Sequence, residues 1–139
     1  MPKGPIPLRM HALAEPFVAI FLIASPWIFG FSDIESCTIV TVVVGAVMLL
    51  GGMLTRWRFS LVKLISLQAH FATDLLLGVA LIVTPFLAGA SDRGDATRFM
   101  VIMGALELLT ALSTRWDERE ESPQPRRRAQ SGTPTRAAG

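Results

Sequence analysis

The chain lacks most of the motifs that common enzymes and metal centres use. Its single cysteine, Cys37, can form neither an internal disulfide nor a cysteine-based zinc site. It has no glycine-rich phosphate loop, no H-E-x-x-H helix and no G-x-S-x-G turn. The N-terminus also lacks a signal-peptide cleavage site, so we expect the first apolar segment to remain as an anchor. The sequence predicts a protein that is not an enzyme and needs no cofactor.

Charged residues are almost absent from four long apolar runs. Hydrophobic residues make up 51% of the chain, and the mean hydropathy is +0.49. The helices of a soluble bundle need a polar face, but residues 16–31 offer only Ser25 as a polar side chain. Each run is near the minimum length for a helix that crosses ~30 Å of hydrocarbon. We therefore expect an all-α integral membrane fold with four transmembrane helices, at residues 16–32, 36–54, 75–91 and 99–113.

Basic residues border these runs unevenly. All but two of the 13 Lys and Arg residues lie before the first run, between the second and third, or after the fourth. The exceptions are Arg93 and Arg98. The positive-inside rule then places both termini in the cytoplasm and predicts a multi-pass protein of the inner membrane. The expected partners are the lipid bilayer, further copies of the chain and other membrane proteins, with no role for nucleic acid.

The sequence repeats itself at an offset of 59 residues. His11 aligns with His70, Pro26 with Pro85, and Thr55-Arg56-Trp57 with Thr114-Arg115-Trp116. The unit is a helical hairpin used twice in the same orientation, which predicts two tandem parallel repeats. The predicted divisions are a cytoplasmic leader at 1–13, hairpins at 14–57 and 70–116, an amphipathic interfacial helix at 58–69, and a disordered basic tail at 117–139.

The duplicated hairpin carries a short motif before each outer turn. In the first hairpin this motif is Ser25-Pro26-Trp27, and with it the chain from Ala14 to Trp116 resembles the SPW-repeat integral membrane proteins of bacteria and archaea. The resemblance implies the architecture of two tandem hairpins and assigns no reaction. The second copy departs from the name motif, since the two triplets read Ser25-Pro26-Trp27 and Thr84-Pro85-Phe86.

Proline within a membrane helix explains part of this motif. Pro26 has no N–H to donate to the carbonyl of Leu22, and we expect the Ser25 hydroxyl to hydrogen-bond back into its own helix. Thr84 stands in the same place beside Pro85. Trp27 is expected at the outer headgroup region, and the motif is interpreted as structural. Tryptophan also ends each hairpin, and Trp57 and Trp116 are expected as anchors at the inner interface.

Ionisable side chains open and close the apolar runs. Glu15 and Asp74 precede the first and third runs, while Arg56 and Arg115 follow the second and fourth. In antiparallel hairpins these residues share one depth, so the simplest prediction is ion pairing of Glu15 with Arg56 and of Asp74 with Arg115.

Two histidines suggest a different arrangement. His11 and His70 each lie four residues before a carboxylate, which places histidine and acid on one helical face. Two such helices could bring together His11, Glu15, His70 and Asp74 as a divalent-metal set. This metal site is the less favoured alternative to the ion pairs.

Glu107 is the one acid placed well inside an apolar run. It lies about 12 Å from Arg115 along a helix. Small residues share its helical face, so we expect it to point into the bundle as a neutral acid that donates one hydrogen bond. The carbonyls left free by Pro26 or Pro85 are candidate acceptors. Glu107 is also the candidate for a proton site.

Three functions remain open from the sequence. The leading hypothesis is a scaffold or accessory subunit that acts through helix–helix association. The alternative is an oligomeric proton- or ion-linked permeation unit that uses Glu107. A membrane-embedded enzyme is third.

Overall fold

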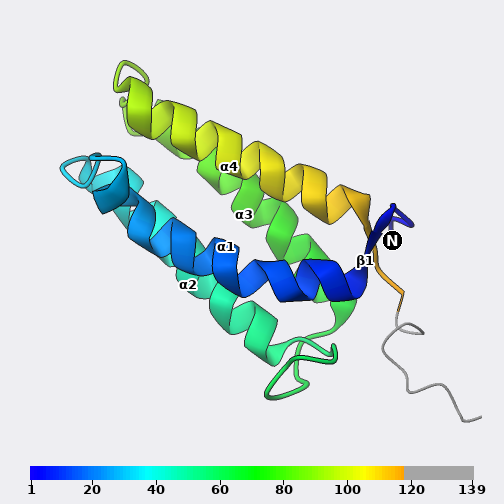
Figure 1. Cartoon of the computed structure of the whole chain (residues 1–139). Coiled ribbons are helices and arrows are strands. Elements are labelled where there is room, and N and C mark those ends of the chain that lie inside the picture. Colours follow the sequence, from blue (N-terminus) through cyan, green and yellow to red (C-terminus); the bar gives the residue numbers. More distant parts are fainter. Residues whose placement is uncertain (118–139) are drawn as a thin grey trace, which may run out of the picture.

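The computed structural model describes residues 1–117, and within that range the fold is four helices in two hairpins (Figure 1). All four helices are long and apolar enough to cross a membrane, which confirms the all-α prediction. The outer turns, at residues 29–34 and 88–93, lie at the same end of the bundle (Figure 1). The helices are α1 (Leu8–Ile28), α2 (Glu35–Leu54), α3 (Leu67–Leu87) and α4 (Gly94–Ser113). The predicted tail at 117–139 lies, apart from its first residue, outside the described residues.

Within each hairpin, a glycine allows the two helices to approach closely. A Cβ added at Gly45 of α2 would lie 2.6 Å from the carbonyl oxygen of Ala19 in α1. A Cβ added at Gly104 of α4 would lie 2.5 Å from the carbonyl oxygen of Gly78 in α3. The two contacts occupy equivalent positions of the repeat. Backbone-to-backbone packing of this kind, which stabilises helix pairs in lipid, is therefore duplicated.

The name motif ends the outward helix of each hairpin. The Ser25 hydroxyl donates to the Leu22 carbonyl at 2.7 Å, as predicted for the acceptor that Pro26 leaves free. In the second copy, the Thr84 hydroxyl donates to the carbonyl of Ala80 at 2.6 Å. This acceptor lies four residues before the donor, whereas in the first copy it lies three residues before. The helices continue through both prolines. Trp27, the predicted outer anchor, is exposed, and so is its counterpart Phe86.

Both prolines also take part in the turn that follows. The carbonyl of Pro26 accepts from the N–H of Phe31, and that of Pro85 accepts from the N–H of Ala90. Such a bond across the helix end requires a left-handed residue, which Gly30 supplies with φ of 70°. Gly89 supplies the same conformation in the second turn, with φ of 64°.

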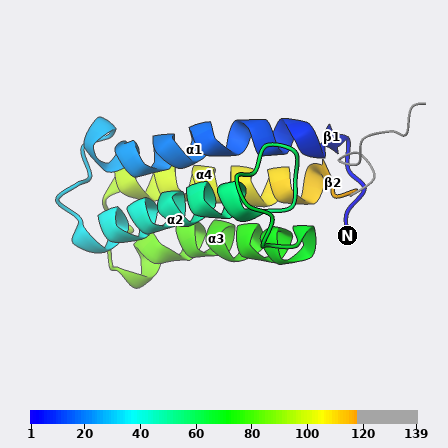
Figure 2. The ribbon, with the colours of Figure 1, turned by 90° about the horizontal axis from the view of Figure 1, so that it is seen from below.

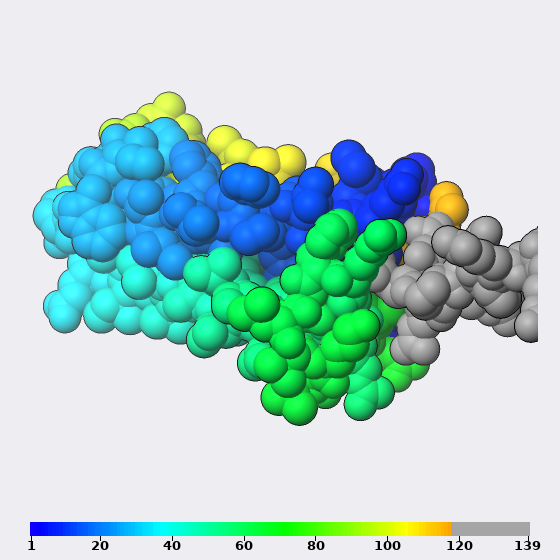
Figure 3. Space-filling view, turned by 60° about the horizontal axis from the view of Figure 1, so that its bottom comes forward, coloured from blue at the N-terminus to red at the C-terminus, as the bar shows by residue number. Residues whose placement is uncertain are grey.

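The connection between hairpins differs from the prediction. Residues 58–66 form an irregular loop rather than an amphipathic interfacial helix, and α3 begins at Leu67. Backbone bonds hold this loop against the end of α2, including Leu64 N–H to Leu54 O at 2.9 Å. The segment (green) stands out from the bundle in Figure 3. α1 begins at Leu8, so the second half of the predicted leader at 1–13 is helical.

The start of the chain pairs with the end of α4. Strands β1 (Ile6–Pro7) and β2 (Thr114–Arg115) form a short parallel ladder in which Ile6 is the partner of Thr114. Figure 2 shows β1 and β2 at the end of the bundle where the loop between α2 and α3 also lies. The ladder therefore connects the first repeat to the second at the end of the bundle where His11 and His70 lie.

Candidate functional site

Four titratable side chains meet in the N-terminal halves of α1 and α3. His11 and Glu15 come from α1, and His70 and Asp74 come from α3. Each is at most 5% exposed. We call these four residues the His–carboxylate cluster. The sequence analysis grouped the same four residues only in the metal site, its less favoured alternative. The structure places them in contact.

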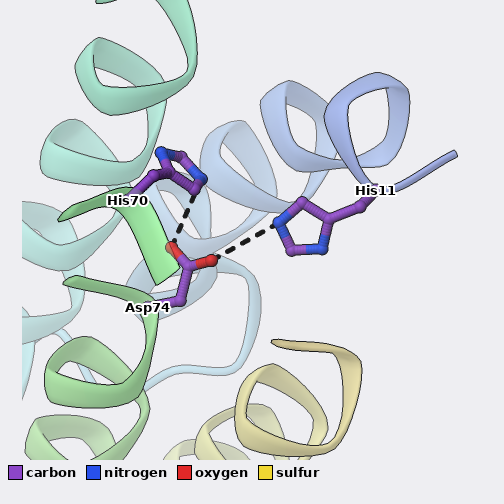
Figure 4. A group of neighbouring side chains, drawn as sticks. All are labelled: His11, His70 and Asp74. Atoms are coloured by element: carbon purple, nitrogen blue, oxygen red, sulfur yellow. Dashed lines mark ion pairs between the residues drawn. The ribbon is translucent and has the colours of Figure 1, made fainter. Parts of the chain in front are cut away.

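The contacts of the cluster cross from one repeat to the other. His70 Nε2 lies 3.2 Å from Glu15 Oε2, and His11 Nε2 lies 3.4 Å from Asp74 Oδ2. Within α3, His70 Nε2 is also 3.4 Å from Asp74 Oδ1, whereas the pair within α1 is longer, at 4.0 Å. Figure 4 shows the carboxylate of Asp74 between the two imidazoles. The cluster thus joins the two hairpins through buried polar atoms.

Each imidazole also contacts a threonine hydroxyl through Nδ1, and that threonine belongs to the opposite repeat. Thr55 Oγ1 lies 2.8 Å from His70 Nδ1, and Thr114 Oγ1 lies 3.2 Å from His11 Nδ1. Each threonine hydroxyl also donates to a backbone carbonyl of its own helix at 2.7 Å. Since a hydroxyl has one proton, the threonine must accept from the imidazole. Both histidines therefore carry hydrogen on Nδ1, and both Nε2 atoms face the carboxylates.

Two tryptophans cover the cluster. The Trp57 ring centre lies 4.6 Å from that of His70, and the Trp116 ring centre lies 5.0 Å from that of His11. Their indole N–H groups donate to the carbonyls of Gly52 and Ala111, at 2.7 and 2.8 Å. The prediction of interfacial anchors is wrong for both rings, because both are buried. They exclude water from the histidines.

The predicted ion pairs with arginine are also wrong. The ion pairs formed by Glu15 and Asp74 within residues 1–117 are with the histidines, while Arg56 and Arg115 are exposed. The reason lies in the backbone after α2 and α4, where the helices end and the chain becomes extended. Because extended side chains alternate between faces, the threonine and tryptophan of each Thr-Arg-Trp triplet point inward and the arginine points outward.

Glu107 points into the bundle, as predicted. It is 8% exposed, and its Oε1 has no hydrogen-bond partner. The carbonyl of Leu22, one predicted acceptor, is already taken by Ser25. Instead, Glu107 shares a pocket of about 210 Å³ between α1 and α4 with His11 and Glu15.

An equivalent pocket reaches the cluster between α2 and α3. It has a volume of about 220 Å³ and is lined by His70, Asp74 and Met48, among others. Met48 occupies the repeat position of Glu107, so the two sides of the cluster differ by one acid. The arrangement provides two ring nitrogens and two carboxylates, and that set can hold a proton or a cation.

Comparison with known proteins identifies the family. The model of the SPW repeat domain matches residues 9–114, which is most of the chain. The chain belongs to the SPW repeat family. No curated protein and no solved structure is significantly similar to it. Together with the four apolar helices, this membership makes the SPW-repeat protein a multi-pass membrane protein.

The motif that names the family lies away from the His–carboxylate cluster. Ser25, Pro26 and their counterparts lie near the C-terminal ends of α1 and α3, whereas the His–carboxylate cluster lies near the N-terminal ends. Sequence reasoning found the four cluster residues but missed the threonines and tryptophans around them. The signal was present, because Thr-Arg-Trp recurs in register in both repeats of the SPW-repeat protein.

Proposed function

We propose that the SPW-repeat protein is a non-enzymatic scaffold or accessory subunit that associates through its helix faces with other membrane proteins or further copies. The observation that supports this proposal is the distribution of its side chains. Polar contacts between helices connect one hairpin to the other inside the bundle, while large apolar side chains face outward from every helix. Phe17 and Leu76, at equivalent positions of the repeat, are 72% and 71% exposed.

The pockets that reach the His–carboxylate cluster are too small for a large organic substrate. The two pockets that reach the cluster measure about 210 and 220 Å³. Pockets that hold drug-sized ligands typically measure about 300–1,000 Å³. A metal ion or a few waters fit such a space, but a large organic substrate does not.

We also propose that the protein lies in the inner membrane with both termini in the cytoplasm. The N-terminal residues, the loop between α2 and α3 and the end of α4 lie at one end of the bundle. Lys3, Arg9, Arg58 and Lys63 belong to these segments. Arg93 and Arg98 are the basic residues of the opposite end, so the positive-inside rule favours this orientation.

Photo-crosslinking in native membranes tests the scaffold proposal. A benzophenone side chain would be placed at one exposed position per helix, and at Leu22 of the core as a control. We expect one face to give a discrete protein adduct, while the other faces react with lipid and Leu22 reacts within its own chain. Absence of a protein adduct at every exposed position would contradict the proposal. The exposed positions are Phe17, Val43, Leu76 and Leu109.

A specific observation favours a second candidate function, a proton- or ion-linked permeation unit. Glu107 is buried with an unpartnered oxygen, and it shares a pocket with His11 and Glu15. Intramembrane acids of this kind commonly mark ion pathways. The pocket therefore brings Glu107 next to two members of the His–carboxylate cluster.

Proton flux into liposomes separates the two candidates. If Glu107 carries protons, wild-type vesicles should relax a pH gradient faster than empty ones, and Glu107→Gln should reduce the flux to background. The same substitution at Glu35, an exposed acid in the first turn of α2, is the matched control and should leave flux unchanged. Wild-type flux no faster than that of empty vesicles would rule out permeation and leave the scaffold.

A further inference from the structure

We propose that the His–carboxylate cluster binds one divalent first-row transition-metal ion. The ligands are Nε2 of His11, Nε2 of His70 and a carboxylate oxygen of Asp74, and Glu15 completes the set. This site goes beyond the proposed function, because neither helix association nor flux through Glu107 requires a metal.

The spacing of the four side chains approaches that of a tetrahedral site, and its longest separations must shorten when an ion binds. At metal–ligand distances of about 2.0–2.2 Å, neighbouring ligand atoms lie about 3.3–3.6 Å apart. His11 Nε2 and His70 Nε2 each lie 3.4 Å from an oxygen of Asp74. Glu15 Oε2 lies 3.2 Å from His70 Nε2 and 4.0 Å from His11 Nε2. One ligand atom from each of the three closest residues falls within 4.8 Å of the others.

The polar atoms at the centre of the cluster have no hydrogen-bond partners. The nitrogen–oxygen contacts are ion pairs only when the histidines are protonated, and with neutral imidazoles nothing donates to these oxygens. Buried polar groups normally have partners, and a set of orphan atoms around one point indicates a missing shared ligand. The unpartnered atoms include Nε2 of His11 and His70, both carboxylate oxygens of Glu15 and Oδ2 of Asp74.

The threonines prepare the imidazoles for a metal. Thr55 and Thr114 accept the Nδ1 hydrogens of His70 and His11, so the Nε2 lone pairs point to the carboxylates. Metal-binding histidines almost always donate their other ring N–H to a fixed acceptor, which sets the tautomer and the ring orientation. Here each acceptor comes from the opposite repeat, so formation of the site depends on the two hairpins being docked.

Charge balance also favours a divalent cation. Glu15 and Asp74 bring two carboxylates into a site covered by Trp57 and Trp116, and burying ionised carboxylates without compensation is costly. One ion of charge +2 neutralises both. The two pockets beside the cluster give an ion of this size access to the ligands from α1 and α4 or from α2 and α3.

The donor set selects the class of metal. Two imidazoles and two carboxylates suit Zn²⁺, Co²⁺ or Fe²⁺, whereas Mg²⁺ and Ca²⁺ prefer all-oxygen sites. No thiolate contributes to the site, because Cys37 lies near the start of α2, at the opposite end of the bundle. We expect Zn²⁺ to bind and Co²⁺ to replace it as a spectroscopic probe.

Cobalt titration of the full chain in detergent tests the proposal. Wild-type protein should bind one Co²⁺ with the intense visible absorption of a tetrahedral ion, and Zn²⁺ should displace it. His70→Gln and Asp74→Asn should abolish this spectrum, while Asp33→Asn, the same change at an exposed loop acid, should preserve it. Thr55→Val should weaken binding by about 10–100-fold, since it removes only the orienting acceptor.

Several results would overturn the metal site. One is a wild-type chain that binds Co²⁺ no more tightly than Asp74→Asn does. The cluster would then be explained by protonated histidines paired with the carboxylates. Another is a spectrum that survives in His70→Gln. Circular dichroism of each metal-free variant checks folding, and X-ray absorption of the zinc-loaded wild type, expected to show two imidazoles, decides the question if a variant fails to fold.

Discussion

Replacing Trp57 with alanine is expected to destabilise the protein by about 3–5 kcal/mol, the usual range for removing a buried tryptophan. The ring is 1% exposed, packs on His70 and donates its N–H to the carbonyl of Gly52. Its loss opens a cavity and exposes the His–carboxylate cluster to water. The free energy of unfolding in a mixed micelle, followed by circular dichroism as denaturing detergent is added, measures the effect.

The matched control is Trp27→Ala. Trp27 belongs to the motif that names the family, but it is 63% exposed and faces outward at the opposite end of α1. Substitutions at exposed positions usually change stability by no more than about 0.5 kcal/mol. Equal losses for the two variants would contradict the burial argument, since the indole of Trp57 would then be acting as a simple interfacial anchor.

Replacing Gly104 with alanine is expected to loosen the hairpin of α3 and α4 at a cost of about 1–3 kcal/mol, typical of overpacking. The added Cβ would meet the carbonyl oxygen of Gly78 at 2.5 Å and the side chain of Ile82 at 2.7 Å. The oxygen belongs to the backbone of α3 and cannot rotate away. The helices must therefore move apart, and the same unfolding assay detects the loss.

Gly51→Ala is the control for this effect. An added Cβ at Gly51 would be no closer than 3.7 Å to its nearest neighbour, the ring of His70, which is ordinary van der Waals contact. Alanine also favours helix more than glycine does. We therefore expect Gly51→Ala to be as stable as the wild type or more so. A Gly104→Ala variant with the stability of Gly51→Ala would show that α3 and α4 are not packed through this glycine.

The fold was largely predictable because its signals are long and repeated. Four apolar runs without a polar face require a lipid environment, and the offset of 59 residues joins them into two equivalent hairpins. The linker was not predictable in the same way. Its apolar and polar residues alternate at helical spacing over a short stretch, but bonds from Leu64 and Ile65 to the carbonyl of Leu54 hold residues 58–66 as a loop.

The sequence identified the four residues of the site, but it did not identify the partners of the two carboxylates. Spacing placed each histidine on the same face as an acid, and the structure confirms that all four residues converge. The choice of arginine as partner failed because shared depth does not fix the direction in which a side chain points. The chain is extended at Arg56 and Arg115, and local sequence does not show which side of an extended triplet faces the core.

The exchange of partners between repeats has an evolutionary consequence. Thr55 of the first hairpin serves His70 of the second, and Thr114 serves His11 in return. Two identical copies of one hairpin, facing each other across a true twofold axis, could make every one of these contacts. The present chain therefore has the form expected of two fused copies of one hairpin that differ at the position held by Met48 and Glu107.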